Sequence, residues 1–462
     1  MTARFFTAIL MLLYSTVLNA QRIELSGTEV QSALVVDVAT GEIIAEYNCK
    51  QRLVPASLTK LVTTAAALDI LGQDYRIKTE FYLVRGNKNA SLIVRGYGDP
   101  TTGSEYFEES SISLVASRVA EALKKQGILH LSKVEFDDSY IKGPGYIDKH
   151  VWEDMGNYYG ATPKSLNIYD NIQNIYLSSP QKAGELCSII GRTPNEDSQI
   201  DCYVQSYSGK SDSAYVYGVD DGCRYISGAI PAGQSSYKVK SVLPNVQYGY
   251  CNELSKELRN TGIVVDMVMQ ESVEIDMTES ELIMTTYSPT VLEMITMTNQ
   301  KSINMFAEAI SLAVAAGKDG NSSSWGEATR SLRAFGKRTM GIEPELYDGS
   351  GLSPFNSLSS RELVDLLLYI SRQPYSKSFR ESLAKAGETG TLSSWGRGSK
   401  LQGRTIGKSG TMTGVIGYAG YVNGNNGKEY AFSILVNHAI EKRQDVRAKV
   451  AKWLSHTIFD SK

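Results

Sequence analysis

Apolar residues near the beginning of the chain follow first a strand pattern and then a helix pattern. Residues 32–38 and 43–48 are strand-like runs on either side of a turn that contains glycine, which predicts a β-hairpin. The next apolar residues recur near a period of 3.6 from about Ala56 to Leu71, with Pro55 at the start, which predicts a helix. The hairpin therefore leads directly into a helix.

The last part of the chain repeats these patterns. Residues 403–422 and 429–438 are strand-like and are separated by a turn-rich segment, and residues 442–458 follow a helical period. We therefore expect an α+β fold, in which an antiparallel sheet built from both chain ends carries helices and the middle of the chain is inserted. Further helices are expected at 288–298, 305–316 and 359–370, with a break at 299–301.

The middle of the chain has a different pattern. Strand-like segments at 78–84 and 91–95 precede one helical segment near 112–125. Beyond Ser165 the chain is rich in Ser, Tyr and Gly and has almost no helical period up to about Asn252. The expected parts are a signal peptide (1–20), a terminal domain (21–75 and 286–462), a second domain (76–165 and 262–285) and a third, mostly β domain (166–261).

Length and charge narrow the class of protein. A chain of 462 residues is long enough for two or three domains with sizeable cores. The formal net charge of −3, with both signs evenly used, argues against a nucleic-acid binder, which would need a basic face.

The N-terminus has the features of a secretory signal. Arg4 precedes the short apolar segment 5–14, and we place cleavage after Ala20. No other stretch approaches the length of a membrane span, which is about 20 apolar residues. We therefore expect an exported protein of the periplasm or cell envelope, with no stable membrane span after the signal is removed.

The cysteines leave disulfide pairing open. Export would permit bridges, and four of the five cysteines cluster between residues 187 and 251. The spacing has no zinc pattern, and we expect neither a metal site nor a cofactor. The five are Cys49, Cys187, Cys202, Cys223 and Cys251.

A serine and a lysine one turn apart begin the first predicted helix. Residues at i and i+3 are neighbours on a helix, so the Lys60 amine could reach the Ser57 hydroxyl. The same spacing occurs elsewhere in the chain, for example at Ser235 and Lys238, so the pair alone has little weight. Taken alone, a surface lysine near a capping serine is the ordinary explanation.

Two further motifs give that pair a context. Ser302-x-Asn304 lies at a predicted break between helices, and residues 408–411, Lys-Ser-Gly-Thr, lie on a predicted strand. Each would be ordinary by itself, as a helix cap and a strand end. Together, in this order and each on the matching element, the three motifs indicate a nucleophilic serine enzyme.

Each catalytic candidate suits one chemical task. Ser57 would attack a carbonyl carbon, Lys60 would accept its proton, and Ser302 would pass a proton towards the leaving amine. The backbone N–H groups of Ser57 and Thr411 could form an oxyanion hole.

The other motif residues suit substrate binding. Asn304 offers an amide donor and acceptor to a peptide-like substrate. Lys408, with the hydroxyls of Ser409 and Thr411, would hold a terminal carboxylate by charge-assisted hydrogen bonds. Gly410 would let a substrate backbone lie along the strand.

A serine hydrolase that uses histidine as its base is disfavoured. The chain has 4 histidines and no Gly-x-Ser-x-Gly elbow. His438 and His456 are expected to be structural or exposed.

With these motifs, the chain resembles the low-molecular-mass class C penicillin-binding proteins, the D-alanyl-D-alanine carboxypeptidase/endopeptidases. The resemblance implies a penicillin-binding, serine β-lactamase-like transpeptidase domain with two domains inserted between the first and second motifs. It also implies cleavage of peptidoglycan stem peptides and cross-links through an acyl-enzyme on Ser57, and covalent inhibition by β-lactams. The further segments that resemble the family are 52–57, 98–100, 143–145, 165–167, 307–308, 348–353 and 390–392.

The resemblance also implies a pocket for the diamino acid of the substrate. Asp154 and Tyr159 match an acidic residue and an aromatic residue that reach its side chain, and Met412 and Thr413 occupy other positions of that pocket. Better-known relatives carry an arginine where this chain has Pro354, so the carboxylate of the diamino acid could be held differently, and an amidated carboxylate is one hypothesis.

Two alternatives stay open from sequence. A serine β-lactamase of similar fold would need an extra carboxylate base for deacylation, and none can be identified. A non-catalytic scaffold that binds β-lactams or peptidoglycan is the other alternative, against which the intact motif set argues.

Overall fold

The computed structural model describes residues 22–86, 89–143, 145–195, 198–219, 224–425 and 427–460. The expected signal peptide lies outside these residues, as does Cys223. The described residues form two compact units: those within Met1–Asp69, Ile295–Ser302 and Arg330–Lys462 make the first, and those within Ile70–Met294 and Ile303–Thr329 make the second. In the described part, no helix combines the length and the apolar character needed to cross a membrane.

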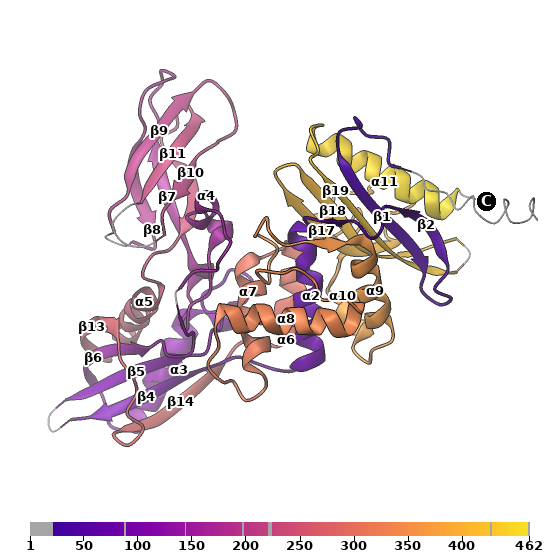
Figure 1. The fold of residues 1–462 in the computed structure, drawn as a ribbon. Coiled ribbons are helices and arrows are strands. Elements are labelled where there is room, and N and C mark those ends of the chain that lie inside the picture. Colours follow the sequence, from indigo (N-terminus) through magenta and orange to yellow (C-terminus); the bar gives the residue numbers. More distant parts are fainter. Residues whose placement is uncertain are drawn as a thin grey trace, which may run out of the picture. The chain divides into compact units, whose positions relative to one another are not determined.

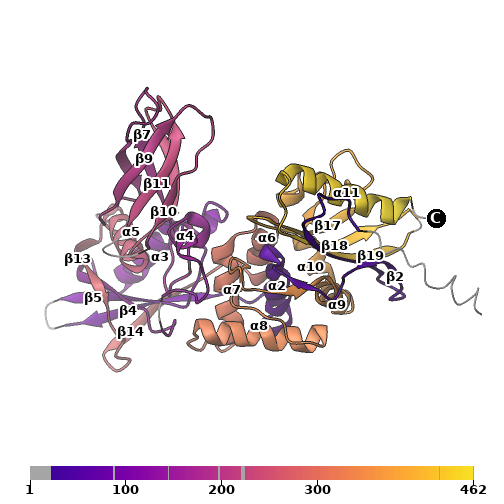
Figure 2. The same ribbon diagram turned by 45° about the horizontal axis from the view of Figure 1, so that its top comes forward.

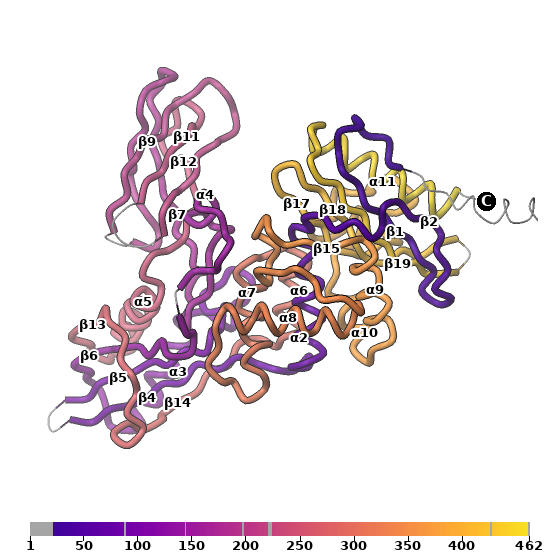
Figure 3. The backbone as a smooth tube through the Cα atoms, viewed as in Figure 1, coloured from indigo at the N-terminus to yellow at the C-terminus, as the bar shows by residue number. Residues whose placement is uncertain are grey.

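The first unit is organised around a six-stranded sheet in the order β16-β17-β18-β19-β1-β2. All neighbouring strands are antiparallel, and the indigo N-terminal strands lie beside the yellow C-terminal ones (Figures 1 and 3). This confirms the α+β fold with a sheet from both chain ends. The strands are β1 (Val30–Asp37), β2 (Ile43–Tyr47), β16 (Ala384–Lys385), β17 (Thr405–Met412), β18 (Val415–Asn423) and β19 (Glu429–Asn437).

Helices cover both faces of this sheet, which explains its long apolar strands. Trp453 and Leu454 of α11 (Arg443–Phe459) join one buried cluster with Val35 and Ile434 of the sheet. The helices α2 (Thr59–Ile70) and α9 (Ser360–Ser371) lie on the other face (Figures 1 and 2). Strands buried on both faces are apolar at nearly every position rather than at alternate ones.

The helix predicted at 56–71 is confirmed, with a tighter first turn. Residues Ala56–Leu58 form a 3₁₀ turn, η1, and α2 follows without a gap. The predicted cap of α9 is also present, since Ser359 and Glu362 exchange hydrogen bonds as a capping box.

The break expected at 299–301 was placed too early. The helix α6 runs from Val291 to Lys301, and the break falls at Ser302, whose backbone is left-handed with φ 63°. A new helix, α7 (Asn304–Ala316), begins two residues later. The other helices and short strands in this part of the sequence are α8 (Trp325–Met340), α10 (Ser376–Ser382), β3 (Arg52–Leu53) and β15 (Leu358–Ser359).

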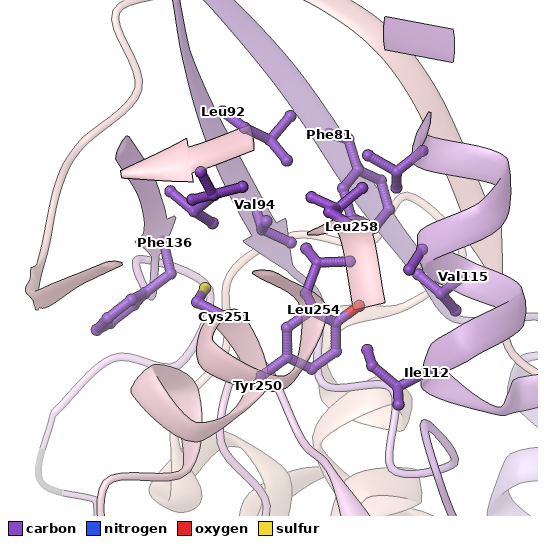
Figure 4. Close-up of a cluster of buried hydrophobic side chains, with 14 of the residues drawn as sticks. Phe81, Leu92, Val94, Ile112, Val115, Phe136, Tyr250, Cys251, Leu254 and Leu258 are labelled. Atoms are coloured by element: carbon purple, nitrogen blue, oxygen red, sulfur yellow. The ribbon is translucent and has the colours of Figure 1, made fainter. Parts of the chain in front are cut away.

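The second unit contains a five-stranded sheet in the order β13-β6-β5-β4-β14. Figure 4 shows the core that this sheet shares with α3 and α5, including Phe81, Val115 and Leu254. The helix α5 was not predicted from the sequence. The elements are β4 (Lys78–Arg85), β5 (Ala90–Gly96), α3 (Ile112–Lys125), β6 (His130–Asp137), α5 (Val246–Asn260), β13 (Val264–Ser272) and β14 (Ser280–Tyr287).

Two three-stranded sheets complete the second unit, in the orders β12-β7-β8 and β10-β11-β9. They share one apolar cluster, in which Ile175 of β7 meets Val204 of β9 and Ile226 of β11. The domain limits expected from the sequence stay a prediction. The strands are β7 (Ile172–Ser178), β8 (Ser188–Thr193), β9 (Asp201–Tyr207), β10 (Tyr215–Tyr217), β11 (Tyr225–Pro231) and β12 (Tyr237–Val242).

The cysteines that the structure describes are free thiols, namely Cys49, Cys187, Cys202 and Cys251. Cys251 is fully buried in the core shown in Figure 4, where it serves as an apolar side chain. A bridge among these four, which the sequence left open, is therefore absent.

Candidate active site

The side chains of Ser57 in η1 and Lys60 in α2 are in contact. The Lys60 Nζ donates a hydrogen bond to Ser57 Oγ at 3.0 Å and another to the backbone carbonyl of Ser350 at 2.7 Å. Lys60 is fully buried, so these partners fix its amine against the serine hydroxyl. An amine within hydrogen-bond distance of a hydroxyl can accept its proton.

The backbone around Ser57 is strained and closely packed. Ala56 has a left-handed φ of 47°, which is costly for a residue with a side chain. A Cβ at Gly410 would lie 2.5 Å from the carbonyl oxygen of Pro55, and one at Gly351 would lie 1.9 Å from that of Ala56. Glycine at Gly410 therefore lets β17 approach the turn that carries Ser57.

Ser302 and Lys408 form a second contact in the same unit. The Lys408 Nζ donates to Ser302 Oγ at 2.9 Å and to the backbone carbonyl of Ser409 at 2.8 Å. The structure thus brings the second and third motifs together. Ser302 adopts its left-handed φ at this contact, as residues at functional sites often do.

Lys408 is wholly buried, and its surroundings lower the pKa of its amine. Burial penalises the ammonium form and the nearby Lys60 repels it, so the pKa of Lys408 lies well below the usual lysine value. A lysine with a lowered pKa can exchange a proton with a hydroxyl near neutral pH more readily than a surface lysine can.

The rest of the third motif lies at the open end of β17. The Ser409 hydroxyl donates to Thr391 Oγ1 at 2.8 Å, whereas Thr411 is exposed. Met412 is half-buried, and Thr413 is exposed in the turn that follows. The exposed Thr411 hydroxyl at this end of the strand can donate to a carboxylate.

Two buried residues of the first unit position parts of the site, and the sequence analysis did not identify them as site residues. Asp348 accepts hydrogen bonds from the backbone N–H of Gly351 at 2.8 Å and of Ser353 at 2.6 Å, which shapes the loop that presents the Ser350 carbonyl to Lys60. The buried amide of Asn299 donates to Ser382 Oγ at 2.9 Å, one turn before Ser302. The glycine-rich sequence at 348–353 signalled a turn, but nothing in it signalled the contact with Lys60.

The remaining candidates come together in the second unit. The Tyr159 hydroxyl donates to Asp154 Oδ1 at 3.0 Å, and the Asn304 side-chain amide donates to the Tyr159 carbonyl at 2.8 Å. Asp154 lies on α4 (Trp152–Met155) and is partly buried. Burial raises the pKa of Asp154, although the hydrogen bond from Tyr159 opposes the rise.

Pro354 follows Ser353, and its side chain is partly exposed. A proline side chain has neither a charge nor a hydrogen-bond donor, so this position cannot pair with a carboxylate in the way an arginine does.

Comparison with known families agrees with this chemistry. A model of the D-Ala-D-Ala carboxypeptidase 3 (S13) family matches residues 18–457. The chain belongs to this family. The family match spans both units and favours a peptidase over a β-lactamase or a non-catalytic scaffold.

Curated relatives of this S13 chain carry matching names. A D-alanyl-D-alanine carboxypeptidase of an Actinomadura species is 27% identical over 432 residues, which cover 88% of this chain and 78% of that protein. The D-alanyl-D-alanine carboxypeptidase DacB of Haemophilus influenzae is 26% identical over 424 residues, which cover 87% of this chain and 84% of that protein.

Solved structures show the same fold. The crystal structure of penicillin binding protein 4 of Haemophilus influenzae has a TM-score of 0.79 and 22% identity, and the match covers 94% of this chain and 98% of that one. A second crystal structure of that protein, complexed with a β-lactam, has a TM-score of 0.75.

Proposed function

We propose that this protein is an exported serine-type D-alanyl-D-alanine carboxypeptidase/endopeptidase that acts on peptidoglycan peptides. The 3.0 Å contact between Lys60 Nζ and Ser57 Oγ is the observation that carries this proposal. It places a base against a serine in the first turn of a helix that lies beside the third motif strand. The family membership supplies the substrate class.

Acylation begins with the transfer of the Ser57 proton to Lys60. The Ser57 oxygen attacks the carbonyl carbon of the penultimate D-alanine, and the backbone N–H groups of Ser57 and Thr411 stabilise the developing oxyanion. Ser302 passes a proton to the nitrogen of the terminal D-alanine, the C–N bond breaks, and an ester remains on Ser57. Water then hydrolyses this ester and regenerates the serine.

Lys408 supports the second proton transfer. Its hydrogen bond to Ser302 Oγ at 2.9 Å holds that hydroxyl in place. Along this hydrogen bond, the Lys408 amine can return a proton to Ser302 after Ser302 has donated its own. The sequence suggested that Lys408 holds the substrate carboxylate directly. In the structure its two amine contacts are internal, so we assign the carboxylate to Ser409 and Thr411.

β-Lactams would react with the same serine. Attack of Ser57 on the lactam carbonyl opens the ring, and the amine formed stays tethered to the acyl group instead of leaving. Because the tethered amine blocks the approach of water, the ester persists. We therefore propose covalent inhibition by β-lactams.

The test is release of D-alanine from a peptide that ends in D-Ala-D-Ala. The purified protein should release one D-alanine per turnover and leave the matched peptide ending in L-Ala-L-Ala intact. A protein that binds penicillin but releases no D-alanine would refute the peptidase assignment.

We propose that Asp154 binds the side-chain ammonium of the diamino acid. Asp154→Asn should then raise KM about 10-fold for peptides with a free side-chain amine, because a hydrogen bond to a charged group is lost, and leave kcat nearly unchanged. Steady-state kinetics on peptides with a free and with an acetylated side-chain amine measure this effect. For the acetylated peptide, the variant and the wild type should have the same KM.

Glu153→Gln is the matched control for that variant. Glu153 is adjacent in sequence but exposed, so its replacement should leave KM unchanged for both peptides. Equal effects of the two substitutions would show that general electrostatics, and not a specific contact, governs KM.

Pro354 leads to a prediction about the side-chain carboxylate of the diamino acid. Because this position offers no cation, we expect peptides with an amidated diaminopimelate carboxylate to be turned over at least as fast as the free acids. Comparing kcat/KM for the two peptides decides the matter, and a strong preference for the free acid would overturn the hypothesis.

A further inference from the structure

One face of the sheet β10-β11-β9 is aromatic and open. Side chains alternate between the faces of a strand, and here Val204, Val216 and Ile226 are fully buried on the inner face. The outer face therefore carries the residues between them. Four tyrosines define what we call the tyrosine face: Tyr203, Tyr215, Tyr217 and Tyr225.

The tyrosine face forms an ordered row across all three strands. Tyr217 lies opposite Tyr225 in the sheet, with ring centroids 4.8 Å apart and planes 12° apart. Tyr203 meets Tyr225 edge-on at 6.1 Å. Tyr203 is 56% exposed and Tyr215 is 44% exposed, although large aromatic side chains are normally buried. Three neighbouring strands span about 10 Å, which is comparable with the length of one disaccharide.

The chemistry of this face favours a neutral, hydroxyl-rich ligand. Among the outward residues of the three strands, Asp201 alone is formally charged, and Gln205 and Ser227 add neutral hydrogen-bonding groups. A nucleic acid would need lysines or arginines here. Aliphatic side chains, which a protein partner would bury, are limited to Ala229 and the buried Pro231. Tyrosine rings instead offer flat apolar surfaces for sugar C–H groups, and their hydroxyls remain free for hydrogen bonds.

The tyrosine face is continuous with the candidate substrate site of the same unit. The backbone N–H of Val216 donates to Asn157 Oδ1 at 3.0 Å, and α4 lies beside β10 (Figures 1 and 2). Asn157 lies between Asp154 and Tyr159 in the sequence, so its hydrogen bond with Val216 joins β10 to the segment that carries both candidate residues. The face thus borders the segment that carries Asp154 and Tyr159.

We propose that the tyrosine face binds the glycan strand of peptidoglycan, an amino-sugar polysaccharide, while its stem peptide enters the Asp154 and Tyr159 site. This inference rests on the proposed function for the identity of the polysaccharide. A polymeric substrate held at two points is retained between cleavage events, because rebinding of the peptide becomes intramolecular.

Binding of fluorescent, peptide-free glycan strands to the full chain tests the proposal. The double variant Tyr203→Ala/Tyr217→Ala should weaken binding about 10-fold, because two stacking rings are removed. The double variant to phenylalanine keeps the rings and should bind nearly as well as the wild type. Tyr287→Ala, which removes another exposed tyrosine outside the face, is the control and should have no effect.

Turnover of a short soluble D-Ala-D-Ala peptide, measured on the same samples, separates the two proposals. Loss of glycan binding with unchanged soluble-peptide turnover supports the tyrosine face. Equal glycan binding by the alanine variant and the wild type would overturn it, as would a wild type that cleaves the peptide but binds no glycan.

Other outcomes would point elsewhere. If the wild type is a dimer and the alanine variant is a monomer that still binds glycan, the face belongs to an interface with a second copy of the chain. Failure to cleave the peptide would refute the proposed function alone.

Discussion

Replacing Ser57 with alanine should abolish covalent labelling by a fluorescent penicillin and lower kcat for D-Ala release by roughly 10³-fold or more. The reason is chemical: without the Ser57 hydroxyl no acyl-enzyme forms, however well the substrate binds. Labelling is measured on denaturing gels and turnover by D-alanine release. Labelling that persists in Ser57→Ala would refute the nucleophile.

Ser235→Ala is the matched control for that experiment. Ser235 has the same spacing to a lysine, Lys238, but is exposed before β12. Its replacement should leave labelling and turnover unchanged. The control shows whether reactivity comes from the serine-lysine spacing alone or also needs the surroundings of Ser57 in the fold.

Replacing Lys408 with methionine should lower kcat/KM by about 10²- to 10³-fold, the range typical of lost proton-transfer assistance. Ser302 would lose its hydrogen-bond donor and the amine that exchanges a proton with it. Because Ser57 and Lys60 remain in place, slow penicillin labelling should still be detectable. Labelling at the wild-type rate would show that Lys408 has no part in acylation.

The same variant should change how stability depends on pH. The pKa of Lys408 is lowered in the folded protein, whereas in the unfolded chain it returns to about 10.4. Between those two values the unfolded chain binds more protons, so wild-type stability rises with pH in that window. Lys408→Met should lose this rise, while Lys452→Met, which removes an exposed lysine, should keep it. Melting temperatures between pH 6 and 10 give the comparison, and parallel curves for wild type and Lys408→Met would contradict the assignment.

Local patterns in the sequence were sufficient for the parts of the fold that local geometry determines. The helix at Ser57 follows from its apolar period, and the contact between Ser57 and Lys60 follows from their i and i+3 spacing. The hairpin before it follows from apolar runs around a glycine turn. These are interactions within a few residues, which a sequence displays directly.

Contacts between distant segments could not be predicted in the same way. Lys408 and Ser302 are 106 residues apart, and a lysine on a strand is expected to point to solvent or ligand unless the fold buries it. The helix α5 was missed although Val246, Tyr250, Leu254 and Leu258 recur at intervals of four residues. Its first turns lie in the tyrosine-rich region, whose composition favoured strands.

The sheet of the first unit has a consequence for synthesis on the ribosome. Val54 is held by the side chain of Asn437, 383 residues later, and β1 pairs with β19 along its whole length. At translation rates of about 5 to 20 residues per second, roughly 20 to 80 s separate the emergence of these partners. The apolar strand β1 and the helix that carries Ser57 must therefore be shielded from aggregation during that interval, and the nucleophile becomes competent only after the C-terminal strands have docked.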